Sequence, residues 1–244
     1  MNDPAKPTFT FHGQVAIVTG AARGIGRAIA DALLAGGADV HGLDWENDQA
    51  IINAAPFPIH KVDIADASAV NDTINSLPAA PSLLVNNAGI TRDRSIAKMS
   101  EDEWSQVINV NLTGAFNVLK ATAPLMAQNG YGRIVNITSI NGMRGKFGQA
   151  NYSAAKAGLI GLTKTAAREF GRKGVTVNAV APGMVMTEMA EQLPEEILAK
   201  ARNEGVVQKL ATPDDIAYGV LFLLSEGAGL ITGEVLRVDG GQYI

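Results

Sequence analysis

The chain has 244 residues, a formal net charge of −4 and no cysteine. These values exclude disulfides, thiolate chemistry and cysteine-ligated zinc, and they argue against a surface that binds nucleic acid. A hydrophobic content of 47% predicts a globular chain, and the length fits one large α/β domain better than two small ones.

The first eleven residues are polar, contain two prolines and lack the pattern of a signal peptide. No apolar run approaches the roughly 20 residues of a membrane span. We therefore expect a flexible N-terminal tail over residues 1–11, a cytoplasmic location and no membrane partner.

Short β-branched apolar runs alternate with longer amphipathic stretches, as a parallel sheet with crossover helices requires. The predicted strands are Val15–Thr19, Asp39–Leu43, Ile59–Val62, Leu83–Asn86, Arg133–Thr138, Val175–Val180 and Val235–Val238. The predicted helices are Gly24–Ala35, Ala67–Leu77, Asp102–Gln128, Tyr152–Gly171, Glu188–Asn203 and Pro213–Leu224. This order predicts one doubly wound, seven-stranded Rossmann domain over residues 1–244, with residues 184–205 as a substrate lid.

A glycine-rich turn joins the first predicted strand to the first predicted helix. It contains Gly20, Arg23, Gly24, Ile25 and Gly26. Glycines there allow a tight turn and let backbone N–H groups and the helix dipole meet a pyrophosphate. The alternative is that glycine serves only the steric needs of a strand-to-helix turn.

Acidic residues follow the second and third predicted strands. Asp44 stands where a carboxylate accepts hydrogen bonds from the adenosine ribose and repels a 2′-phosphate, which favours NAD over NADP. Arg23 favours the opposite choice, because it can pair with such a phosphate. Asp63, with the adjacent Ile64, is a candidate for the adenine edge, or else it caps the next helix.

The histidines His12, His41 and His60 show no metal-ligand spacing, and we predict no metal site.

Ser139, Tyr152 and Lys156, which all follow the fifth predicted strand, indicate hydride-transfer chemistry. Tyr152 and Lys156 are four residues apart and share one face of a helix, thirteen residues after Ser139. Lowering the pKa of a phenol from about 10 to about 7 needs on the order of 4 kcal/mol. A unit charge about 4 Å away at an effective dielectric of about 20 supplies roughly that amount. The alternative is an ordinary solvated Tyr–Lys pair.

With these residues the chain resembles the short-chain dehydrogenase/reductase family from about Gln14 to Gly241. The matching positions are Thr19 to Gly26, Asn86 to Gly89, Asn111, Ser139, Tyr152, Lys156, Pro182, Gly183 and Thr187. The resemblance implies hydride transfer between a secondary alcohol and a ketone, a nicotinamide cofactor and a homotetramer.

The resemblance also implies a role for each residue. Tyr152 would exchange a proton with the substrate oxygen and Ser139 would stabilise that oxygen. Lys156 would hold the nicotinamide ribose, and Asn111 would anchor a water that links the lysine to solvent. The remaining cofactor contacts would come from Asn87, Ala88 and Gly89 near the adenosine and from Pro182, Gly183, Val185 and Thr187 near the carboxamide. Asn111 and Thr187 have structural alternatives, as a buried helix amide and a helix N-cap.

Within the family, the segment from Asn141 to Ser153 looks most like acetoacetyl-CoA and 3-oxoacyl-[acyl-carrier-protein] reductases. This implies a 3-oxoacyl thioester that contacts Ser139, Asn141, Gln149 and Tyr152, with Arg144 or Lys146 available for carrier phosphates. Because those reductases usually take NADPH, Asp44 leaves a second reading open, an NAD-dependent dehydrogenase of a small apolar or aromatic secondary alcohol such as a 1-arylethanol.

A third reading is a non-catalytic dinucleotide-binding regulator. Such a protein is expected to lack the tyrosine or the lysine, and this chain has both.

Overall fold

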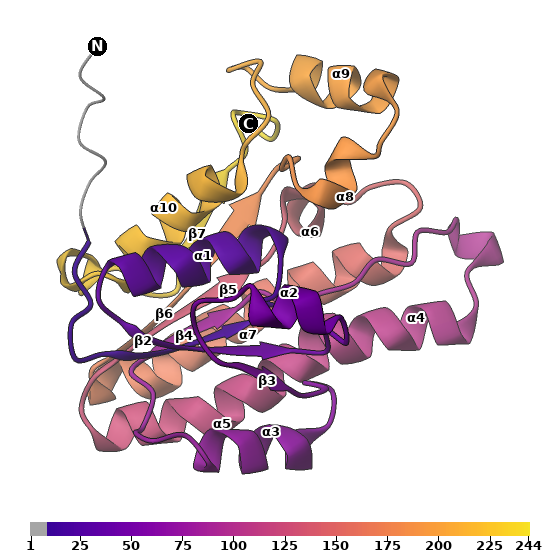
Figure 1. Ribbon diagram of the computed structural model, residues 1–244. Helices are drawn as coiled ribbons and strands as arrows, with labels where there is room; N and C mark the ends of the chain where they lie inside the picture. Colours follow the sequence, from indigo (N-terminus) through magenta and orange to yellow (C-terminus); the bar gives the residue numbers. More distant parts are fainter. Residues whose placement is uncertain (1–8) are drawn as a thin grey trace.

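The computed structural model describes residues 9–244, apart from the side chain of Met189. Seven parallel strands form one sheet in the order β3-β2-β1-β4-β5-β6-β7 (Figure 1). The strands are β1 Val15–Thr19, β2 Asp39–Asp44, β3 Ile59–Lys61, β4 Leu83–Asn86, β5 Gly132–Ile137, β6 Val175–Pro182 and β7 Val235–Val238. The predicted doubly wound, seven-stranded fold is confirmed.

Helices cover both faces of the sheet, because the central strands β1, β4, β5 and β6 are buried along their whole length. On one face α1 (Gly24–Ala35) and α10 (Pro213–Leu224) pack on Val18, Val85 and Val135. On the other face α3 (Ala67–Asn75), α5 (Ala115–Gln128) and α7 (Ala150–Phe170) pack on Ile17 and Leu84. Figure 1 shows the two helical layers above and below the sheet.

The strand order reverses between β1 and β4, which are neighbours at the centre of the sheet. In sheets of this kind, ligands bind at the carboxyl ends of the strands beside such a switch point. Thr19 and Asn86 end these two strands, so the glycine-rich turn and the segment after β4 meet at this edge.

The long predicted helix from Asp102 to Gln128 is present as one continuous helical stretch with an irregular centre. It consists of α4 (Glu101–Ile108), a π-helical segment η2 (Asn109–Gly114) and α5. Widened π turns inside α-helices are frequent at functional sites. Asn111, a candidate site residue, lies in this one.

The predicted helix Glu188–Asn203 is wrong as a single element. The structure has two helices there, α8 (Glu188–Glu191) and α9 (Glu195–Glu204). Pro194 lies between them, and a proline removes a backbone donor and clashes with the preceding turn. The sequence also did not indicate the short helices α2 (Gln49–Asn53) and α6 (Ile140–Arg144), nor the 3₁₀ turns Ile96–Lys98, Gly171–Lys173 and Glu226–Ala228.

The N-terminal segment packs on the domain from an earlier residue than predicted. The N-terminal tail was expected to reach residue 11, but Phe11 is buried and packs in the same core as α1. Residues 1–8 lie outside the described residues.

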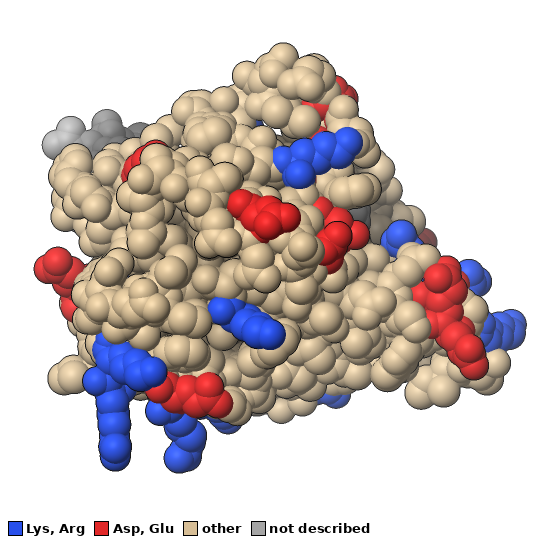
Figure 2. Space-filling model, turned by 90° about the horizontal axis from the view of Figure 1, so that it is seen from below, with Lys and Arg blue, Asp and Glu red and all other residues tan. Residues whose placement is uncertain are grey.

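On the face in Figure 2, lysine and arginine side chains are scattered among acidic ones and form no continuous basic patch. Within residues 9–244, no helix is long and apolar enough to cross a membrane.

Candidate active site

The glycine-rich turn after β1 is packed against the segment after β4. A Cβ added to Gly26 would lie 2.0 Å from the carbonyl oxygen of Gly20, and one added to Gly20 would lie 2.9 Å from Nδ2 of Asn87. Asn87 Nδ2 donates to the Thr19 and Gly20 carbonyls at 3.0 and 3.2 Å, and the Asn87 and Ala88 N–H groups donate to Thr19 Oγ1. Gly20 and Gly26 therefore have a steric role within the protein itself.

Gly24 is different, because a Cβ added there would make only an ordinary van der Waals contact. It has a φ of +59°, and the nearest atom to an added Cβ is Thr187 Cγ2 at 3.7 Å. The N-cap residue of α1, Arg23, makes no side-chain capping bond, and no acidic residue occupies the first turn. The first N–H groups of the helix have no partner within the helix, so this end fits the pyrophosphate of a dinucleotide.

A cluster of charges lies beside this turn at the end of β2. Asp44 accepts hydrogen bonds from the N–H of Ala22 at 2.8 Å and of Glu46 at 3.0 Å. Each carboxylate oxygen keeps a further lone pair for a ribose hydroxyl. Glu46, which sequence reasoning missed, forms an ion pair with Arg23. The cation that favoured a 2′-phosphate is thus paired with a second carboxylate.

Asp63 and Ile64 lie after β3, at the next strand end along the sheet. Asp63 is exposed and accepts from the Ala65 N–H at 2.9 Å, whereas Asp66 caps α3. The expected alternative role of Asp63 as a helix cap is therefore wrong. Ile64 is buried, and its side chain leaves no room for a Cβ on Gly114 in the π-helical segment.

Asn111 joins the π-helical segment to the chain after β4. Its Oδ1 accepts from the Ile90 N–H at 2.8 Å, and its Nδ2 donates to the Ile90 carbonyl at 3.0 Å. The side chain is buried, and an added Cβ on Gly89 would lie 3.3 Å from Oδ1. The structural alternative for Asn111, a buried amide that bonds backbone, is therefore present. Asn86 ties β4 to β5 through Asn136 at 2.9 Å.

Ser139, Tyr152 and Lys156 are brought together at the carboxyl end of β5. Ser139 is the N-cap of α6, and its side chain interacts with the Tyr152 phenol and lowers the pKa of that phenol. Lys156 Nζ lies 5.6 Å from the centre of the Tyr152 ring and donates to the Ile137 carbonyl at 2.8 Å. Gly142 allows this arrangement, because an added Cβ would lie 2.8 Å from the backbone of Lys156.

The electrostatics of the pair differ from the expectation. Burial raises the pKa of the Tyr152 phenol, the Ser139 hydrogen bond acts in the opposite direction, and the Asp93 carboxylate raises the pKa further. Burial also lowers the pKa of Lys156 to about 8. The predicted lowering of the phenol pKa is therefore wrong for the protein alone, because desolvation of the phenol is the largest influence and it raises the pKa.

A chain of amide contacts lies next to this pair. Asn141 Nδ2 donates to Gln149 Oε1 at 3.0 Å, and Gln149 Nε2 donates to Asp93 at 2.8 Å. Arg94 and Gln149 form a parallel bridge, which brings the segment after β4 to the start of α7. Asp93 is a second residue that sequence reasoning missed as part of the site. Its place shortly after β4, four residues beyond the predicted contact Gly89, was the available signal.

The segment after β6 lies opposite the glycine-rich turn. Pro182 ends β6, the Gly183 N–H donates to the Val238 carbonyl at 3.2 Å, and Val185 is buried. Thr187 is the N-cap of α8, with its hydroxyl accepting from the Ala190 N–H at 3.4 Å. The structural alternative for Thr187 is thus present, and its side chain also faces Gly24.

The histidines lie away from the site. His41 and His60 are on neighbouring strands with ring nitrogens 3.1 Å apart, and burial lowers the pKa of His60, helped by His41. Among the described residues, no group of three or more potential ligands could hold a metal ion.

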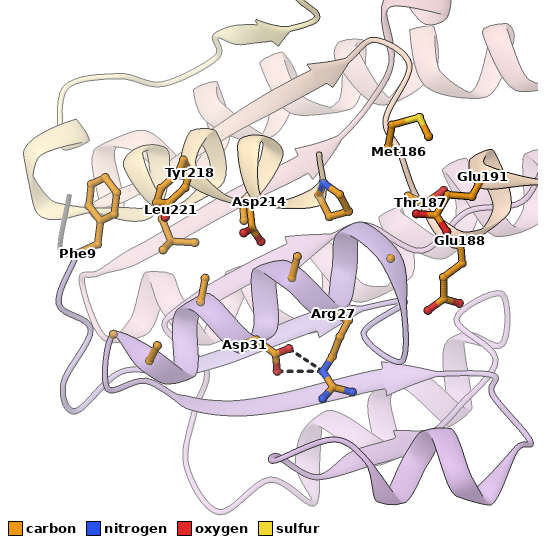
Figure 3. A pocket seen from close by; sticks show the side chains of 17 residues that line it. Phe9, Arg27, Asp31, Met186, Thr187, Glu188, Glu191, Asp214, Tyr218 and Leu221 are labelled. Atoms are coloured by element: carbon orange, nitrogen blue, oxygen red, sulfur yellow. Dashed lines mark hydrogen bonds and ion pairs between the residues drawn. The ribbon is translucent and has the colours of Figure 1, made fainter. Parts of the chain in front are cut away.

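A groove of about 620 Å³ runs between α1 and α10 (Figure 3). Ala28, Ala32 and Leu221 line its floor, and Glu188 and Glu191 stand at one end. Of the predicted site residues it contains only Gly24 and Thr187. The groove therefore adjoins the cofactor end of the site and does not hold the Ser139–Tyr152 pair.

A Rossmann sheet with a glycine-rich turn at its switch point and a Ser–Tyr–Lys cluster defines a class of dinucleotide-dependent oxidoreductases. A family model described as enoyl-(acyl carrier protein) reductase matches residues 20–242. The chain belongs to the short-chain dehydrogenase/reductase family, and it is an NAD(P)-dependent enzyme acting on CH–OH or keto groups.

Relatives and a solved structure match over nearly the whole chain. Acetoacetyl-CoA reductase of Rhizobium meliloti (strain 1021) is 45% identical over 241 residues, covering 94% of this chain and 98% of the relative. 3-oxoacyl-[acyl-carrier-protein] reductase FabG of Vibrio harveyi is 44% identical, covering 95% and 98%. The crystal structure of a putative gluconate dehydrogenase from Agrobacterium tumefaciens superposes with a TM-score of 0.90 at 28% identity, covering 97% and 98%.

Proposed function

We propose that this protein is an NAD(H)-dependent oxidoreductase that interconverts a secondary alcohol and a ketone, with a 3-hydroxyacyl/3-oxoacyl thioester as its substrate. The observation that carries the proposal is the cluster of Ser139, Tyr152 and Lys156 at the end of β5, in which the buried Lys156 Nζ lies 5.6 Å from the centre of the Tyr152 ring. The names of two relatives, an acetoacetyl-CoA reductase and a 3-oxoacyl-[acyl-carrier-protein] reductase, support the thioester.

In this proposal the residues divide the chemistry between them. A nicotinamide dinucleotide, when bound, supplies or accepts the hydride. Tyr152 donates its phenolic proton to the substrate oxygen in ketone reduction and accepts it in alcohol oxidation. Ser139 donates a hydrogen bond to the same oxygen and stabilises its charge. The Lys156 ammonium stabilises the phenolate and holds the nicotinamide ribose.

The other predicted contacts position the two ligands. We assign Gly24 and Ile25 to the pyrophosphate, and Asn87, Ala88 and Gly89 to the adenosine side. Asp63 and Ile64 border the adenine, while Pro182, Gly183, Val185 and Thr187 border the carboxamide. Because both polar atoms of the Asn111 amide bond Ile90, a water at Asn111 would use its remaining hydrogen or lone pair.

NAD is favoured over NADP by charge. A 2′-phosphate at the end of β2 would meet the Asp44 carboxylate, and the nearby Arg23 is paired with Glu46. Like charges brought together without a partner are costly. The same observation favours the second candidate, an NAD-dependent dehydrogenase of a small apolar or aromatic secondary alcohol.

One assay separates the candidates. Reduction of acetoacetyl-CoA is compared with oxidation of a panel of secondary alcohols that includes 1-phenylethanol, each with the NAD and NADP forms of the coenzyme. We expect thioester turnover with NADH. Inert thioesters together with rapid oxidation of alcohols by NAD would replace the first candidate with the second.

The Tyr152→Phe variant provides the control for chemistry. Its turnover should fall by about 10²–10⁴, the usual contribution of a general acid, while coenzyme affinity stays nearly unchanged. Tyr131→Phe is the matched variant, because Tyr131 lies just before β5, at the opposite end of that strand, and its hydroxyl has no hydrogen-bond partner among residues 9–244. Retained activity in Tyr152→Phe would contradict the assigned proton donor.

A further inference from the structure

The lid segment, residues 184–205, has a small core of its own. Leu198 and Ala201 form a cluster with Leu210 and the partly buried Met184, Met186 and Leu193, separate from the two cores that flank the sheet. Since little of the apolar packing of α9 involves the main body, polar contacts largely determine how α9 is held.

Arg144, the last residue of α6, makes one of these contacts and two others. Its guanidinium lies 3.2 Å from Glu204 at the end of α9, and donates to the carbonyl of Gln242 at 3.1 Å and to Oδ1 of Asn141 at 3.2 Å. One side chain thereby joins the lid segment, the C-terminal tail and the helix that Ser139 caps.

The C-terminal tail, residues 239–244, contacts the lid segment at two further points. The Gln242 side chain accepts from the Met184 N–H at 3.0 Å and donates to the Ala201 carbonyl at 2.8 Å. The turn that places it contains Gly240 and Gly241, both with positive φ. In Figure 1 the C-terminal end of the chain lies near α9 and α10.

The Arg144 contact continues to the catalytic tyrosine. Because Asn141 Oδ1 accepts from Arg144, its Nδ2 is directed to Gln149, whose Nε2 in turn donates to Asp93. Asp93 is the carboxylate whose charge acts on Tyr152. Arg144 at one end of this chain and the acceptor-only Asp93 carboxylate at the other therefore set the orientation of both amides.

We propose that Arg144 is a positioning residue. It holds the lid segment against α6, the helix that Ser139 caps, and it aligns the side-chain amides of Asn141 and Gln149, which contact substrate in the proposed function. The proposal deepens the proposed function, since its kinetic test uses the substrate of that reaction. It differs from an Arg144 that binds a carrier phosphate directly, because here Glu204 and Gln242 are the partners that Arg144 needs.

Glu204→Gln distinguishes these two roles. If Arg144 fastens the lid, the variant raises the KM for every substrate by about threefold and leaves kcat within about twofold, as the loss of a partly exposed ion pair would. If Arg144 binds phosphate, freeing it from Glu204 lowers the KM for acetoacetyl-CoA and leaves the KM for a small neutral ketone unchanged. The second result would overturn the proposal.

Arg144→Ala should raise KM further, by about tenfold, and adding Glu204→Ala to it should have no further effect, because the two residues act as one unit. The matched control is Arg202→Gln, which breaks an ion pair with Glu195 at 2.8 Å that lies entirely within α9. It should leave KM unchanged. Additive effects of the two Ala substitutions would contradict the coupling.

A measurement on the free protein is independent of the reaction. Amide hydrogen exchange over residues 195–204 should be faster in Arg144→Ala and Glu204→Gln than in the unsubstituted chain, while exchange in β5 stays unchanged. Unchanged exchange in α9 would overturn the proposal even if thioester turnover is confirmed. Faster exchange without any thioester activity would instead remove only the proposed substrate.

Discussion

At the scale of single residues, burial shifts the pKa values of Tyr152 and Lys156 in opposite directions. Desolvation disfavours the charged form of each side chain, so it raises the pKa of the phenol and lowers that of the ammonium. The protein alone therefore does not make the Tyr152 phenol a base at neutral pH. A second positive charge, such as an oxidised nicotinamide, supplies the remaining stabilisation of the phenolate in our proposal.

The buried lysine has a consequence for stability. The folded chain releases the Lys156 proton near pH 8, whereas the unfolded chain holds it to about 10.5. The unfolded state binds more protons between these values, so stability should rise with pH in this window. The full burial cost is present below pH 8.

We therefore expect the free energy of unfolding to rise from pH 7 to pH 10, relative to that of Lys156→Met, by on the order of 2–3 kcal/mol. Urea denaturation at each pH measures it. Lys164→Met removes the same charge from an exposed position of α7. The difference in free energy of unfolding between the unsubstituted chain and Lys164→Met should therefore not change with pH. Parallel curves for Lys156→Met and the unsubstituted chain would contradict the burial cost.

Coenzyme choice is also determined by single residues. Asp44→Ala should raise kcat/KM with NADP relative to NAD by about tenfold, about 1.4 kcal/mol, and adding Glu46→Gln should raise it further by releasing Arg23. Initial rates with both coenzymes measure the ratio. Asp48→Asn removes a nearby carboxylate that caps α2, retains the cap and should leave the ratio unchanged. An unchanged ratio in the double variant would remove the charge argument.

At the scale of elements, local patterns predicted the frame of the molecule. The buried strands are apolar runs with strong β propensity, and α10 begins at the predicted residue, Pro213, where Thr212 and Asp215 form a capping box. Asp44 follows from its place at the end of β2. These features depend on neighbours in the sequence, which explains why they could be predicted.

Features that depend on distant contacts could not be predicted in this way. Arg144 and Gln242 are 98 positions apart, and Arg23 and Glu46 are 23 apart, so no local pattern indicates either pair. The direction of the Tyr152 pKa shift depends on burial, which spacing does not give. The break at Pro194 is different, because a proline within a helical pattern is a local signal that a helix ends or kinks at the preceding residue.

At the scale of the whole molecule, large apolar side chains remain exposed away from the site. Trp104 on α4 and Phe116 on α5 are 42% and 43% exposed, and both lie on the continuous stretch from Glu101 to Gln128. Phe222 on α10 is 41% exposed, and β7, with a single neighbouring strand, ends the sheet next to it. Apolar surfaces of this kind mark interfaces between proteins.

We therefore predict that copies of this chain associate through these two surfaces into a homotetramer. Sedimentation equilibrium should give a mass of four chains of 25.5 kDa each. Phe116→Asp places a charge in one of the two surfaces and should reduce the assembly to dimers, because a buried unpaired charge is costly. Phe147→Asp changes a 92% exposed residue in the loop before α7 and should leave the mass unchanged. A single-chain mass for the unsubstituted protein would show that these side chains are exposed for another reason.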